Sequence, residues 1–149
     1  MRTEPLPEHY ESSPEDPRVA FMAHLDFLKT AHLGSAILCF AYAMAFALTL
    51  PYLLTGVDEE GEKISLGWPS WAFYLGTAAA FLNTFSHAWA FVLLRKRYTD
   101  IPNRLKLLSY YQLAAVWGGC FYPWHITMGI MTLALLRKEY APEWFNVKK

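Results

Sequence analysis

Charged side chains are missing from three long stretches of this sequence. Residues 30–57, 64–94 and 107–136 contain no Asp, Glu, Lys or Arg, although the chain has 13 acidic and 13 basic side chains. A soluble domain spreads charge along its amphipathic elements, whereas apolar runs longer than about 18 residues are typical of membrane-spanning helices. The pattern predicts an all-α, polytopic transmembrane bundle in a bacterial inner membrane and excludes a soluble enzyme.

The sequence also lacks the features of several other classes of protein. Its two cysteines, Cys39 and Cys120, lie inside charge-free runs, so neither a disulfide framework nor a zinc site is expected. A formal net charge of zero offers no basic face for nucleic acid. The metalloprotease pattern HExxH and phosphate-binding glycine loops are absent, as are intramembrane acids for proton-coupled transport. We expect a protein that is not an enzyme and, as the first expectation, binds no cofactor or metal.

The chain divides into a tail and one helical domain. Residues 1–17 are rich in Pro and Glu and are expected to be disordered on their own. Residues 18–149 are expected to form a single transmembrane domain, in which residues 18–29 form a helix at the interface or lead into the first span. The expected spans are residues 30–55, 69–94 and 107–136.

The third apolar run leaves two arrangements open. As one straight helix its 30 residues would measure about 45 Å, against about 30 Å of hydrocarbon. Gly118, Gly119 and Pro123 also interrupt its centre. The run is therefore either a long, kinked span or a hairpin of two half-length helices.

The distribution of Lys and Arg favours the hairpin. Three basic residues precede the first span, one lies in the loop 56–68, five lie in the linker 95–106 and four follow residue 136. With a cytoplasmic N-terminus, a hairpin places 12 of these inside and one outside, whereas three full spans place eight inside and five outside. We therefore expect the N-terminus and the linker in the cytoplasm and the loop in the periplasm.

Small and polar residues recur at helical spacing inside the apolar runs. Such faces let membrane helices approach closely and hydrogen-bond to one another. We expect five of these residues to pack helices together: Gly76, Ala80, Asn83, Gly129 and Thr132. A milder face of small residues in the first span includes Ala36, Cys39 and Ala43.

The histidines have two interpretations. In the simpler one, each intramembrane histidine hydrogen-bonds a neighbouring helix. In the other, His87 and His125 hold a haem or a chlorophyll-type pigment, since the hairpin places them at depths that differ by about one helical turn. His24 and His32 are expected near the cytoplasmic interface.

The last apolar segment resembles a known group of proteins. It contains GCFYPW followed by GIMTLALL, which is similar to C-L-F-x-P-F-G-T-x-L-G-V-F-T-L in a widespread group of small, uncharacterised bacterial polytopic membrane proteins. The resemblance covers about residues 24–145 and includes His32 and the basic linker. It implies a polytopic membrane fold and no particular activity. Where the group has a glycine after Pro-Phe, this chain has His125.

These observations lead to one main functional expectation. Few residues are expected outside the bilayer, and the sequence shows no set of catalytic residues. We therefore predict an accessory or assembly subunit that packs against a larger membrane complex, such as a respiratory or photosynthetic one. Its expected partners are the lipid bilayer and other membrane subunits. A protein that binds a cofactor through His87 and His125 is the alternative, and a small channel or transporter is the third expectation.

Overall fold

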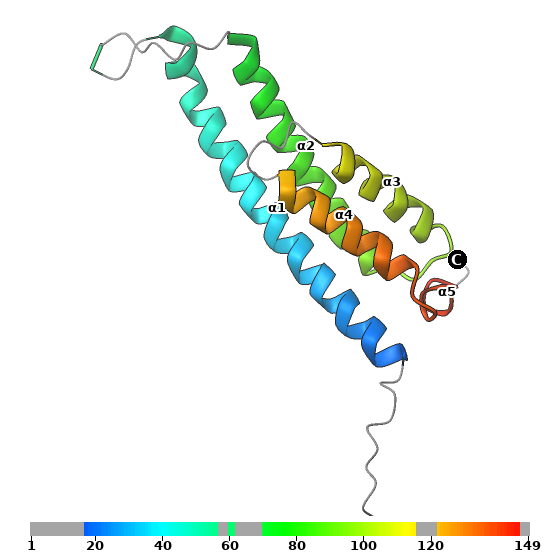
Figure 1. The fold of residues 1–149 in the computed structure, drawn as a ribbon. Helices are drawn as coiled ribbons and strands as arrows, with labels where there is room; N and C mark the ends of the chain where they lie inside the picture. Colours follow the sequence, from blue (N-terminus) through cyan, green and yellow to red (C-terminus); the bar gives the residue numbers. More distant parts are fainter. Residues whose placement is uncertain (1–16, 57–59, 62–69, 116–121, 147–149) are drawn as a thin grey trace, which may run out of the picture.

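The computed structural model describes residues 17–56, 60–61, 70–115 and 122–146, which form helices with no strand among them (Figure 1). The helices are α1 (Pro17–Thr55), α2 (Ser70–Leu94), α3 (Ile101–Ala114), α4 (Tyr122–Leu136) and α5 (Ala141–Trp144). The prediction of an all-α fold is therefore confirmed. The prediction of a disordered tail concerns residues that, apart from Pro17, lie outside those described.

The first two helices are long and apolar. α1 has 39 residues and α2 has 25, which correspond to about 58 and 37 Å at 1.5 Å per residue. Each is long and apolar enough to cross about 30 Å of hydrocarbon. Residues 18–29 continue without a break into the first predicted span. Pro51 is inside α1, close to its C-terminal end, and its ring nitrogen has no hydrogen to donate to the carbonyl oxygen of Ala47.

The third apolar run is two helices that lie side by side. α3 and α4 run in opposite directions in Figure 1, and the hydroxyl of Tyr122 donates to the carbonyl oxygen of Leu113 at 3.2 Å. The described parts of residues 107–136 therefore form two antiparallel helices rather than one kinked helix. Helix α3 also starts before the predicted span. α3 begins at Ile101, inside the predicted linker, because Pro102 occupies the first helical turn, where proline is favoured.

This bundle buries several polar side chains and exposes many large apolar ones. Among the residues that the structure describes, nine polar ones are buried: His32, Ser35, Asn83, Ser86, His87, Ser109, Gln112, His125 and Thr132. Large apolar side chains such as Leu48, Trp71 and Phe85 are more than 60% exposed. Soluble domains bury their large apolar residues and rarely expose extended apolar surfaces.

An apolar cluster lies at the end of the bundle that contains α5, where the start of α1 and the end of α2 meet α3 and α4. Phe21 and Leu25 of α1 are fully buried there, and Phe21 packs its ring edge-on to Tyr140 at 5.5 Å between centroids. Burial of each such side chain away from water contributes about 1.5–3 kcal/mol. Lys138 donates to the carbonyl oxygen of Ala20 at 2.9 Å. The start of α1 is therefore fixed to the segment that follows α4.

Candidate functional site

Three buried histidines from three helices meet inside the bundle. His32 of α1 and His87 of α2 have no exposed surface, and His125 of α4 is 1% exposed. The Nδ1 atoms of His32 and His87 lie 2.9 Å apart, and His87 Nε2 lies 2.8 Å from His125 Nδ1. The rings of His87 and His125 are stacked, with 4.9 Å between their centroids. We refer to these three residues as the histidine cluster.

The hydrogen-bond partners fix the direction of proton donation along the cluster. Thr132 donates its one hydroxyl proton to the carbonyl oxygen of Met128 at 2.8 Å. Its oxygen therefore accepts from His32 Nε2, which lies 3.1 Å away. A neutral His32 then accepts at Nδ1 from His87, and a neutral His87 accepts at Nε2 from His125. All three rings can be neutral in this arrangement, as burial away from water favours.

The cluster ends at an unused ring nitrogen. His125 Nε2 is buried and has no hydrogen-bond partner among the described residues. The thiol of Cys39 in α1 lies close by, since one ligand atom each from Cys39, His87 and His125 can be chosen so that all three lie within 4.8 Å of one another. The amide of Gln112 in α3 lies 3.4 Å from His87 Nδ1, where its oxygen can face that N–H. Helices α1, α2 and α4 thus present three metal-ligating groups to one point.

The cluster contains both histidines that the sequence singled out and one that it placed elsewhere. His87 and His125 come together, as their similar depths predicted. His32 was expected near the interface and was not assigned to a site; the structure buries it fully and bonds it to His87 and Thr132. The signal was present in the sequence, since His32 precedes Ala36 by one helical turn and belongs to the same small-residue face.

Four of the five predicted helix-packing residues are buried, and the fifth, Gly76, is half-buried against α1. A Cβ atom on Gly76 would meet the ring of Phe46 in α1 at 3.3 Å, and one on Gly129 would meet the carbonyl oxygen of Ser109 in α3 at 2.9 Å. Ala80 is buried, and Asn83 accepts a hydrogen bond from Tyr111 at 3.1 Å.

Thr132 serves a more specific purpose than packing. Its hydroxyl holds His32 in place at the start of the histidine cluster. The small and polar faces therefore pack the helices of this chain against one another and also orient the cluster.

A tetrapyrrole between His87 and His125 does not fit this arrangement. A metal bound in line between two imidazoles, at about 2 Å from each, needs nitrogen atoms about 4 Å apart. His87 Nε2 and His125 Nδ1 are 2.8 Å apart and hydrogen-bonded, and both rings are buried. A macrocycle would need α2 and α4 to separate.

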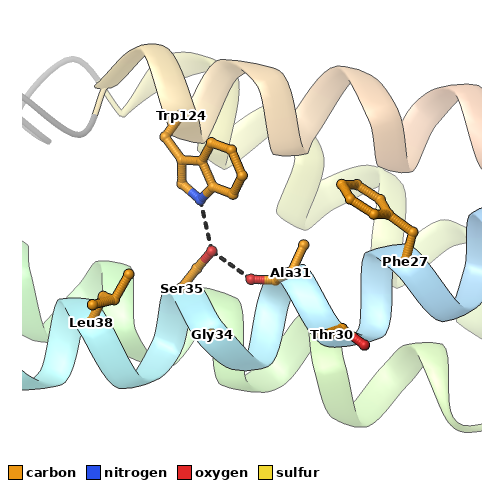
Figure 2. Close-up of a pocket in the computed structure, with 7 residues that line it drawn as sticks. All are labelled: Phe27, Thr30, Ala31, Gly34, Ser35, Leu38 and Trp124. Carbon is orange, nitrogen blue, oxygen red and sulfur yellow. Dashed lines mark hydrogen bonds between the residues drawn. The ribbon is translucent and has the colours of Figure 1, made fainter.

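A hollow lies outside the histidine cluster, between α1 and α4 (Figure 2). It has a volume of about 310 Å³ and is lined by Phe27, Thr30, Ala31, Gly34, Ser35, Leu38 and Trp124. Its polar groups are occupied, since Trp124 Nε1 donates to Ser35 Oγ at 2.7 Å and Ser35 donates to the carbonyl oxygen of Ala31 at 2.6 Å. The hollow therefore presents a mainly apolar surface, and its hydrogen bonds join α1 to α4.

Comparison of the chain with known protein families, with curated proteins and with solved structures found no match. The resemblance to the bacterial membrane-protein group stays a prediction.

Proposed function

We propose that this chain is a non-catalytic integral membrane protein and an accessory or assembly subunit of a larger membrane complex. The exposed apolar surface of the bundle supports this most strongly. The exposed apolar side chains of α1 and α2 need hydrocarbon or protein around them rather than water. Buried hydroxyls such as Ser109 and Thr132 donate to carbonyl oxygens of their own helices, so the helices leave few polar groups unsatisfied in lipid.

We further propose that α1 and α2 cross a bacterial inner membrane while α3 and α4 enter it and return. The basic residues between α2 and α3 lie at the same end as those that follow α4, since Arg97 stacks on Trp144 at 4.2 Å. Lys138 brings the start of α1 to that end as well. The positive-inside rule assigns this end, with the N-terminal side of α1, to the cytoplasm.

The surface proposed for a partner lies on the N-terminal half of α2. α3 and α4 have 14 and 15 residues, and in Figure 1 α1 and α2 extend past them at the end away from α5. A hollow of about 270 Å³ lies on the N-terminal half of α2, lined by Leu75, Ala78, Ala79 and Leu82. Small side chains of this kind let a helix of another subunit approach the backbone closely.

A variant that fills this hollow tests the accessory role. After mild detergent extraction, we expect the wild-type chain to migrate with a large complex on a native gel. Ala78→Leu should reduce that share severalfold, because its added side chain occupies the hollow and keeps a partner helix away. Phe81→Leu is the matched control, since Phe81 is an exposed apolar residue outside the hollow on the same helix. A wild-type chain that migrates alone would overturn the role.

Binding of a haem or chlorophyll-type pigment is a second candidate function. The unpartnered Nε2 of His125 favours it, and the direct contact of His125 with His87 counts against a shared macrocycle. A visible absorption band in protein purified from its native membrane would support it. A channel or transporter ranks third, because the charge-free runs offer no acid to carry a proton or bind a cation.

A further inference from the structure

We infer that Cys39, His87 and His125 form an intramembrane site for one soft monovalent metal ion, Cu(I). The three residues are all buried and come from α1, α2 and α4, and their ligand atoms lie within 4.8 Å of one another. A site assembled from three helices exists only in the folded bundle. It goes beyond the accessory role and would be present whether or not the chain joins a complex.

The hydrogen bonds prepare His87 to act as a ligand. His87 Nδ1 donates to His32, which leaves the lone pair of Nε2 facing His125. Metal-bound histidines in proteins almost always donate their other ring N–H to a neighbouring group, and this fixes the tautomer and the ring orientation. His32 is therefore a positioning residue, held in turn by Thr132.

The unpartnered nitrogen of His125 is the second observation that points to a ligand. A buried polar atom with nothing to bond is costly unless something occupies the space it faces. Two nitrogens bound to one ion at about 2.0 Å and at a trigonal or tetrahedral angle lie about 3.3–3.5 Å apart. For Nε2 of both rings to bind the ion at this separation, the 2.8 Å hydrogen bond from His125 Nδ1 to His87 Nε2 has to open, because the lone pair of His87 Nε2 cannot accept that proton and bind the ion at once.

Ligand softness and charge select the ion. A thiolate with two imidazoles suits Cu(I) and zinc among the biological metals. Cu(I) with one thiolate and two neutral imidazoles has no net charge, whereas Zn²⁺ with the same ligands keeps one positive charge. The charge-free runs that hold the three ligands contain no acid to balance that charge, and an unpaired charge in an apolar interior is expensive. Binding replaces the S–H bond of Cys39 with a sulfur–copper bond and releases one proton to solvent.

Metal loading of the full-length protein tests the site. In detergent and under anaerobic conditions, we expect one Cu(I) per chain in competition with a chelator, and Zn²⁺ binding at least 100-fold more weakly. X-ray absorption at the copper edge should report one sulfur and two nitrogen ligands. Because this measurement uses the wild-type chain, it decides the proposal even where a variant fails to fold.

Single substitutions then assign the ligands. Cys39→Ser and His125→Ala should weaken Cu(I) binding at least 100-fold, and His32→Ala should weaken it about 10–100-fold, as loss of a positioning partner does. His24→Ala should bind like the wild type, because His24 is in the same helix as His32 but outside the cluster. Copper retained in Cys39→Ser, no sulfur ligand in the wild-type spectrum, or a preference for zinc would overturn the proposal.

Discussion

Gly129→Leu is expected to lower the free energy of unfolding by about 3 kcal/mol, near the upper end of the usual cost of overpacking. A Cβ atom at this position would lie 2.9 Å from the carbonyl oxygen of Ser109, a backbone atom of α3 that cannot rotate away. The two helices would have to separate, and Tyr122 would lose its bond to Leu113 as they did so. Detergent-solubilised protein titrated with a denaturing detergent and followed by circular dichroism provides the measurement.

Gly34→Leu is the matched control for this substitution. Gly34 is also in a helix, but a Cβ atom there would meet nothing within 4 Å. Because leucine favours a helix over glycine by about 0.8 kcal/mol, the control should be as stable as the wild type or more so. Equal losses in the two variants would show that the close approach of α3 and α4 is not what Gly129 provides.

His87→Leu is expected to lower the free energy of unfolding by about 2–4 kcal/mol. The substitution leaves His32 Nδ1 and the N–H of His125 without their partner, and each unsatisfied buried group costs about 1–3 kcal/mol. The same detergent titration measures the loss. His24→Leu, which changes a histidine outside the cluster, should cost about 1 kcal/mol or less.

A triple variant separates the polar network from simple packing. Replacing His32, His87 and His125 together by leucine removes every ring that would be left without a partner, so it should recover part of the stability lost in His87→Leu. It should also bind no copper. A triple variant that is less stable than the sum of its single substitutions would show that the network stabilises the bundle more than apolar packing can.

Much of this architecture could be predicted from the sequence because charge is distributed so unevenly. The charge-free runs identified the long helices, and the excess of basic residues favoured the folded-back third segment that α3 and α4 form. The ends of the helices were harder to predict from the sequence. The start of α3 at Ile101 lies inside the charged linker, where hydropathy indicates no helix, and Pro102 is the residue that is typical of its first turn.

The candidate site was predictable only in part. His87 and His125 could be identified as a pair, because their depths follow from counting residues back from Arg95 and Arg137 at the ends of the apolar runs. The participation of Cys39 and His32 depends on the rotation of α1 against α2 and α4, which a single sequence does not fix. His32 also lies only three residues from Lys29, so distance from the nearest charge pointed to the interface, whereas the continuous α1 buries it.

Thiol labelling in intact cells tests the claim that this bundle spans a membrane most directly. In a chain with Cys39 and Cys120 replaced by serine, single cysteines are placed at Glu60, Leu38 and Leu82. A membrane-impermeant maleimide added to spheroplasts should label the cysteine at Glu60 from the periplasmic side. It should not label those at Leu38 and Leu82 until the protein is denatured, although both positions are exposed on the bundle. If the cysteines at positions 38 and 82 reacted as fast as the cysteine at position 60, the surfaces of α1 and α2 that carry them would lie in water, which would contradict the account.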